Sequence, residues 1–212
     1  MPKVYKLEPI DRVFSITWNI GTRCNYDCMY CPTTLHDNHS KHTSLELLKR
    51  RWQLIYEKTS HTNLPYKISF TGGEVSANKN FLPLVRWIRN YHESKIFKIL
   101  ATSNGSASLS YYRRLITLVD NLSLSLHSEH VDEQKFFDTV LLLHQNLPVG
   151  KHLHVNIMDE FWNQQRIPYY QALLKQQGIS HSVNKIDYSL QTRTVPIMKG
   201  KLNLALQQSS VL

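Results

Sequence analysis

Short apolar, β-branched runs alternate along the chain with longer stretches whose apolar residues recur at helical spacing. The short runs predict strands over residues 13–20, 66–70, 97–102, 122–126, 152–158 and 182–188. The stretches between them predict helices over 44–55, 81–91, 109–118, 131–143 and 161–177. Thr43 or Ser44 is suited to cap the first helix, and Gly178 to end the last. Six strand-helix repeats predict an α/β fold with a parallel sheet and right-handed crossovers.

Chain length limits how far this sheet can close. The chain has 212 residues, 42% of them hydrophobic, which is enough for one domain with one core. A closed eight-stranded barrel needs about 250 residues, so we predict an incomplete parallel (β/α)6 barrel. We assign residues 1–190 to this core and 191–212 to a basic C-terminal tail that contains Arg193, Lys199 and Lys201. No stretch approaches the roughly 20 apolar residues of a membrane span, which predicts a soluble, cytoplasmic protein.

All three cysteines of the chain lie in one CxxxCxxC segment. Cys24, Cys28 and Cys31 can supply three thiolates from a single loop. Three thiolates can hold three corners of a cubane iron-sulfur cluster and leave the fourth iron without a protein ligand. A disulfide framework is disfavoured, because the count is odd and a chain of this size can bury a core without crosslinks.

Structural zinc is the alternative for these cysteines. A zinc ion would need a fourth ligand, and His36 or His39 follows closely enough to complete a Cys3His site. Zinc sites usually pair two ligand dyads across a longer loop, whereas these three cysteines share one short segment. The zinc alternative corresponds to a basic binding module without catalysis.

A second motif follows the second predicted strand. Gly72, Gly73 and Glu74 form a Gly-Gly turn that ends in a carboxylate. The glycines permit positive φ and close approach of a ligand to the backbone, and Glu74 can accept a hydrogen bond from an ammonium group. A Gly-Gly turn alone is common, but one that follows a CxxxCxxC segment by a single strand-helix unit is more specific.

The two motifs resemble the signature of the radical S-adenosylmethionine (radical SAM) superfamily, including the aromatic Tyr30 before the last cysteine. The resemblance implies a 4Fe-4S cluster on the three cysteines, an incomplete barrel, and SAM held partly by Tyr30 and by the GGE motif. Val75 departs from the pattern, since many relatives have proline there. The implied reaction is reductive cleavage of SAM to a 5′-deoxyadenosyl radical, which abstracts a hydrogen atom from an anionic small molecule or a peptidic substrate. An electron donor such as flavodoxin or ferredoxin is implied as a partner.

Polar residues at the ends of the later strands are further candidates. In barrels of this kind the site lies at the carboxyl ends of the strands. By the resemblance, Ser103, Asn104, Ser125, His127 and Asn156 are candidates for contact with SAM. The alternatives are an Asn-Gly turn for Asn104, a structural histidine, and a protein partner for the amide of Asn156.

The cysteine count and the net charge restrict the reaction and its partner. Three cysteines leave no thiol for an auxiliary cluster or for returning a hydrogen atom to the substrate. Activases of glycyl-radical enzymes, which are also small and have one cluster, therefore remain an alternative. Lys and Arg number 25 against 16 Asp and Glu, a net charge of +9, which favours an anionic partner. No motif supports nucleic-acid binding.

Overall fold

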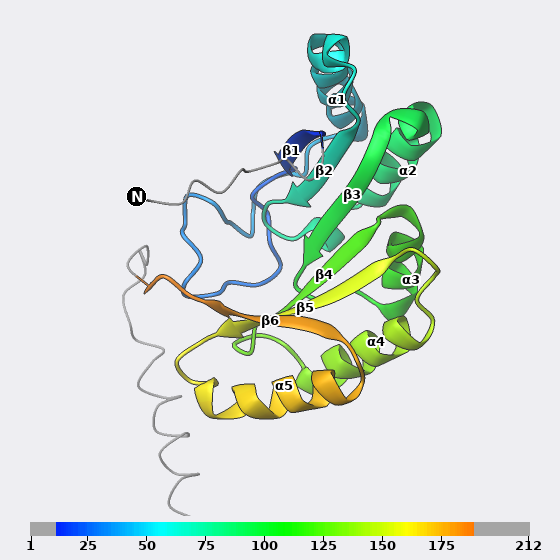
Figure 1. Cartoon of the computed structure of the whole chain (residues 1–212). Coiled ribbons are helices and arrows are strands. Elements are labelled where there is room, and N and C mark those ends of the chain that lie inside the picture. The colour runs from blue at the N-terminus through cyan, green and yellow to red at the C-terminus, as the bar shows by residue number, and fades with distance from the viewer. Residues whose placement is uncertain (1–11, 189–212) are drawn as a thin grey trace, which may run out of the picture.

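The structure, a computed structural model, describes residues 12–188 and contains one six-stranded sheet (Figure 1). The strands are parallel and lie in the order in which they occur along the chain, from β1 to β6. No pairing joins β1 to β6 within these residues, so the barrel is open, as predicted. The strands are β1 (Phe14–Asn19), β2 (Tyr66–Thr71), β3 (Ile96–Ser103), β4 (Asn121–Leu126), β5 (His152–Asp159) and β6 (Ser180–Lys185).

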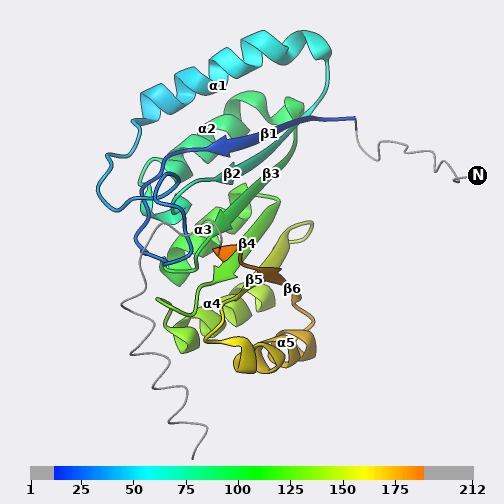
Figure 2. The same ribbon diagram turned by 90° about the vertical axis from the view of Figure 1, so that its left-hand side faces the viewer.

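Five helices connect the strands and lie on the outer side of the curved sheet (Figures 1 and 2). Three of them begin at a side-chain cap, because Ser44, Ser108 and Asp132 each accept a hydrogen bond from a backbone amide of the first turn. The helices are α1 (Leu45–Thr59), α2 (Phe81–His92), α3 (Leu109–Leu118), α4 (Glu133–Gln145) and α5 (Ile167–Gln176). Short 3-10 turns are η1 (Ser60–Thr62), η2 (Val75–Ala77), η3 (Glu93–Lys95) and η4 (Gln164–Arg166).

The predicted boundaries are wrong at the C-terminal end of the described chain. The helix expected over 161–177 begins only at Ile167, because Asn163 closes a turn back onto Glu160 and Met158 before η4. The strand expected over 182–188 lies over Ser180–Lys185 instead. Its first residues are polar, so an apolar run does not mark them, yet they pair with β5. The tail predicted over 191–212 lies outside the described residues.

The strands alternate between a buried outer face and a polar inner face. On β2, Ile68 and Phe70 are fully buried under the helices, whereas Ser69 and Thr71 point to the other side. The same alternation places Leu124 of β4 in the core, and Ser123 and Ser125 on the inner side. We call this inner side of the sheet the concave face. The helices therefore pack against one side only, and the concave face is left to the functional site.

Within residues 12–188, no helix combines the length and the apolar character that crossing a bilayer requires.

Candidate cofactor site

The three cysteines lie in the loop between β1 and α1, beside the carboxyl ends of the strands. A single backbone bridge between Arg23 and Asp37 draws the two ends of this loop together. The Cys24 amide donates to the Asp37 carbonyl at 2.7 Å, and the Asp37 amide donates to the Thr22 carbonyl at 3.1 Å. The Asp37 carboxylate also accepts hydrogen bonds from the Thr22 hydroxyl and from Ser40. These bonds fix the cysteine loop at its neck.

The Gly-Gly turn packs directly against the cysteine loop. The Gly73 amide donates to the Gly21 carbonyl at 2.8 Å, and the Glu74 amide donates to the Arg23 carbonyl at 2.9 Å. A Cβ atom added to Gly73 would lie 2.2 Å from the Arg23 carbonyl oxygen, and one added to Gly72 would lie 2.4 Å from the Gly21 oxygen. Gly72 also has φ +131°. The glycines therefore allow close approach of the cysteine loop itself, a role that the sequence reasoning assigned only to a ligand.

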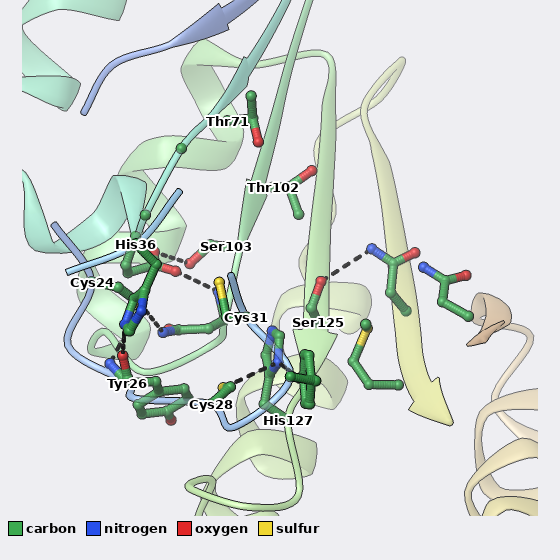
Figure 3. A pocket seen from close by; sticks show the side chains of 18 residues that line it. Cys24, Tyr26, Cys28, Cys31, His36, Thr71, Thr102, Ser103, Ser125 and His127 are labelled. Carbon is green, nitrogen blue, oxygen red and sulfur yellow. Dashed lines mark hydrogen bonds between the residues drawn. The ribbon is translucent and has the colours of Figure 1, made fainter. Parts of the chain in front are cut away.

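The predicted site residues surround one cavity of about 290 Å³. Figure 3 shows the cysteines on their loop, with Thr71, Thr102 and Ser125 on the neighbouring strands. All twelve residues proposed from the sequence lie on its wall, together with residues that the sequence reasoning missed. The lining is Cys24, Tyr26, Cys28, Tyr30, Cys31, His36, Thr71, Gly72, Gly73, Glu74, Thr102, Ser103, Asn104, Ser125, His127, Asn156, Met158 and Asn184.

The chemistry of the cysteines fits a metal cluster. Burial raises the pKa of the Cys24 and Cys28 thiols, so both are protonated near neutral pH unless a cation replaces the proton. No lysine or arginine is among the residues that line the cavity. A bound metal would supply the positive charge that three buried thiolates require. The Tyr26 amide donates to the Cys24 sulfur at 3.4 Å, and His127 lies 3.7 Å from the Cys28 sulfur, contacts that tune cluster potentials.

The separation of the cysteine sulfurs does not favour a single zinc ion. A tetrahedral zinc with bonds of about 2.3 Å to sulfur needs ligand atoms within roughly 4 Å of one another. In residues 12–188, the one group of three or more ligand atoms within 4.8 Å of one another is Cys28, Glu129 and His130, which includes only one cysteine. His39 is largely exposed, with 83% of its side-chain surface accessible. His36 lines the cavity, but its Nε2 is 2.6 Å from the Tyr26 carbonyl oxygen.

Glu74 is a buried carboxylate with hydrogen bonds but no cation. It is 4% exposed, and it accepts from the Ser103 hydroxyl at 2.6 Å, the Asn104 amide at 2.7 Å and the Ser76 amide at 2.7 Å. Burial raises its pKa, and these hydrogen bonds offset only part of that shift. No salt bridge reaches it within the described residues. A ligand ammonium group in the cavity would neutralise this carboxylate.

Asn104 serves both in a turn and on the cavity wall. Its side-chain amide donates to Asn25 at 3.0 Å and lies 4.0 Å from the Cys24 sulfur, so it connects β3 to the cysteine loop. Gly105 follows with φ +75°, and a Cβ there would lie 2.5 Å from the ring of Phe136. Asn104 therefore lies in the expected Asn-Gly turn and also on the cavity wall, and its contact with SAM stays a prediction.

Tyr30 and His127 form a pair beside Cys28. The Tyr30 hydroxyl hydrogen-bonds to His127 Nδ1, and the two rings stack with an interplanar angle of 12°. Burial lowers the pKa of His127 to about 4, so its ring is neutral near pH 7. A neutral ring beside Cys28 supplies no positive charge to the Cys28 thiol.

Asn156 and Ser125 occupy the wall opposite the cysteine loop. The Asn156 amide donates to the Ser125 hydroxyl at 3.2 Å, and its oxygen accepts from Ser182 at 3.3 Å. The protein thus satisfies Asn156 by itself. The sequence analysis missed other wall residues, such as Thr71 and Thr102, which lie at inward positions of β2 and β3. The alternation of apolar and polar residues along each strand could have identified them.

The chain is similar to a curated protein and to solved structures. No family model matches the chain. An S-adenosylmethionine-dependent nucleotide dehydratase of Selenomonas ruminantium is 30% identical over 118 residues, which are 54% of this chain and 39% of that protein. The chain thus covers well under half the length of this curated relative.

Two solved structures of SuiB from Streptococcus suis have the same fold. One, bound to the precursor peptide SuiA, aligns with a TM-score of 0.61 and 15% identity over 94% of this chain and 46% of SuiB. The other, bound to S-adenosylmethionine, aligns with a TM-score of 0.57 and 14% identity over 94% of this chain and 45% of SuiB.

The fold is that of the SuiB structures, and the CxxxCxxC and GGE motifs resemble the signature of the radical SAM enzymes. The chain resembles the radical SAM superfamily in its fold and in both motifs.

Proposed function

We propose that the chain holds a 4Fe-4S cluster on Cys24, Cys28 and Cys31 and binds SAM in the adjoining cavity. The observation that carries this proposal is one cavity in which three cysteines and a buried carboxylate meet without a lysine or arginine. When bound and reduced, the cluster would supply one electron to SAM, which splits into methionine and a 5′-deoxyadenosyl radical that takes a hydrogen atom from the substrate.

The residues of the chain would hold SAM and exclude water. Glu74 would accept a hydrogen bond from the SAM ammonium, since it is buried and lacks a cation. Ser103 and Asn104 would keep the Glu74 carboxylate in place through the hydrogen bonds that they already donate. Tyr30, Gly72, Gly73, Ser125, His127 and Asn156 would form the remaining wall around SAM.

We further propose an anionic small molecule or a peptide as substrate, and a flavodoxin or ferredoxin as electron donor. The name of the curated relative, a nucleotide dehydratase, supports an anionic substrate. The peptide in the SuiB structure supports a peptidic one. The three cysteines are the only thiols of the chain and all belong to one cluster, so the electron must come from outside it. Loss of such clusters in air favours a cytoplasmic location.

The test is anaerobic. The protein is reconstituted with iron and sulfide, reduced with dithionite and incubated with SAM, and 5′-deoxyadenosine is measured by mass spectrometry. Wild type should contain about four iron and four sulfide per chain and form the product, whereas Cys28→Ala should lose both. Stoichiometric zinc in place of iron, with no product, would overturn the proposal.

A second variant separates SAM binding from cluster assembly. Glu74→Gln should keep its iron but bind SAM more weakly and form less product, because the amide cannot neutralise an ammonium group. Glu46→Gln is the matched control, since Glu46 is exposed on α1 and pairs only with Lys49. Equal SAM affinity in Glu74→Gln and wild type would show that Glu74 does not hold the ammonium group.

A further inference from the structure

From the cavity, the concave face continues toward the amino ends of the strands as a polar surface. Along β2, Lys67 and Ser69 share the face of the cavity residue Thr71, because side chains alternate along a strand. On β4 and β5, Ser123 and His154 are register partners on the same face. A closed barrel would fill this space with apolar layers, whereas here most inward positions, with Leu100 of β3 as an exception, carry hydrogen-bonding groups. The face is built to meet a hydrophilic occupant.

Two lysines lie next to each other near the amino ends of β2 and β3, at the far end of this face from the cavity. Lys67 of β2 and Lys98 of β3 are direct register partners. Like charges on neighbouring strand positions repel, so this arrangement costs stability unless an anion binds between them. No salt bridge to either lysine occurs within residues 12–188.

The acid that shares a surface depression with Lys98 is already engaged. Asp120 shares a surface depression with Lys98 and His152. Its carboxylate, however, binds Arg89, Lys151 at 3.1 Å and the Ile99 amide at 2.7 Å. Lys98 instead lies over the ring of Phe97, 5.1 Å from its centroid. The two lysines are therefore available for an external anion.

The lysines and the cavity are separated by a defined length of strand. Lys67 precedes Thr71 by four residues, which is about 13 Å along a parallel strand. Ser69 of β2 and its register partner Leu100 of β3 lie between the two ends, and Ser123 and His154 are level with the cavity residue Thr102. An occupant that reaches both ends is elongated, with an anionic group at one end.

We propose that the concave face binds a phosphorylated small-molecule substrate, with its phosphate on Lys67 and Lys98 and its reacting carbon in the cavity. A phosphate matches two adjacent cations because it carries up to two charges and several acceptor oxygens. This assignment rests on the proposed function, and it adds the substrate class and the residues that select it.

The test measures anion binding apart from catalysis. Inorganic triphosphate is titrated calorimetrically into the reconstituted protein and into the double variant Lys67→Gln/Lys98→Gln. Loss of the two lysines should weaken binding by roughly tenfold for each lysine. A double variant of two exposed lysines on outer helices, Lys58→Gln/Lys175→Gln, is the matched control and should bind as wild type does.

Two further measurements keep the outcome clear. Thermal unfolding should show the Lys67→Gln/Lys98→Gln variant at least as stable as wild type without triphosphate, because a repulsion has been removed. Substrate-independent formation of 5′-deoxyadenosine should be unchanged in the variant. If neither protein cleaves SAM while triphosphate binding still depends on the two lysines, the proposed function fails and the anion site stands.

Three results would overturn the inference. They are the absence of triphosphate binding to wild type, equal binding to the lysine variant, and a tetraglutamate peptide that binds as tightly with the same dependence on the two lysines. The last result would assign the face to an acidic peptide.

Discussion

Replacing Gly73 by alanine tests whether the Gly-Gly turn exists to receive the cysteine loop. An added Cβ would lie 2.2 Å from the Arg23 carbonyl oxygen, whereas ordinary contacts begin at 3.4 Å. The turn and the loop must therefore separate by roughly 1 Å. Such a separation would break the hydrogen bonds from Gly73 to Gly21 and from Glu74 to Arg23.

These two effects set the expected loss. Overpacking costs about 1 to 3 kcal/mol, and each backbone hydrogen bond contributes about 1 kcal/mol, so Gly73→Ala should lose about 3 to 5 kcal/mol. With a urea dependence of about 2.5 kcal/mol per molar, the unfolding midpoint should fall by roughly 1.5 M. The variant should also retain less iron after reconstitution, since the loop no longer holds its geometry.

Circular dichroism in urea and iron analysis, both under anaerobic conditions, measure these outcomes. Gly150→Ala is the control, because Gly150 has φ +78° but nothing within 4 Å of an added Cβ. Only backbone strain of about 1 to 2 kcal/mol is expected there, with full iron content. A Gly73→Ala variant that loses no more stability than Gly150→Ala and keeps its iron would refute the docking argument.

Three further predictions concern carboxylates. Hydrogen bonds from a backbone amide, Arg89 and Lys151 outweigh burial and lower the pKa of Asp120. Asp120→Asn should therefore destabilise the fold by about 2 kcal/mol above pH 5, and urea titrations should show this difference begin to shrink as pH falls below about 4 and continue to shrink through the lowered folded-state pKa. Burial raises the pKa of Glu160 from 4.5 to about 7, so the stability of wild type relative to Glu160→Gln should fall by about 3 kcal/mol as pH rises from 4.5 through 7, and a flat difference in urea titrations would contradict this. Asp37→Asn should lower iron retention, because an amide accepts fewer of the hydrogen bonds that close the cysteine loop; iron content equal to wild type would contradict the role of Asp37.

The alternation of strands and helices could be predicted from the sequence, because helices cover the outer face of each strand and the residues on that face are apolar. Ile68 and Phe70 mark β2 in this way. The sequence analysis misplaced the bounds of β6, where Ser180 and His181 belong to the strand through pairing with β5 rather than through apolar burial. Strands whose inward side is polar carry half the usual hydrophobic signal, so their boundaries depend on their neighbours.

The two motifs could be recognised from the sequence because the chemistry of each lies within a few consecutive residues. The contacts between the motifs could not be predicted. Cys24 and Glu74 are separated by 50 positions, and their spacing does not predict the hydrogen bond from the Glu74 amide to the carbonyl of Arg23, the residue before Cys24. The role of Asp37 was likewise hidden, because a carboxylate in a polar loop looks the same whether it closes a turn or faces solvent. Such contacts depend on the path of the chain in space.

The backbone contacts between the Gly-Gly turn and the cysteine loop have a consequence for protein engineering. Neither segment has its geometry on its own, since each supplies hydrogen-bond partners to the other. A cysteine loop grafted onto another scaffold would keep its three thiols but lose the partner that shapes it. Transplantation should therefore succeed only when the segment around Gly73 is moved together with residues 20–37, as one cassette on two adjacent parallel strands.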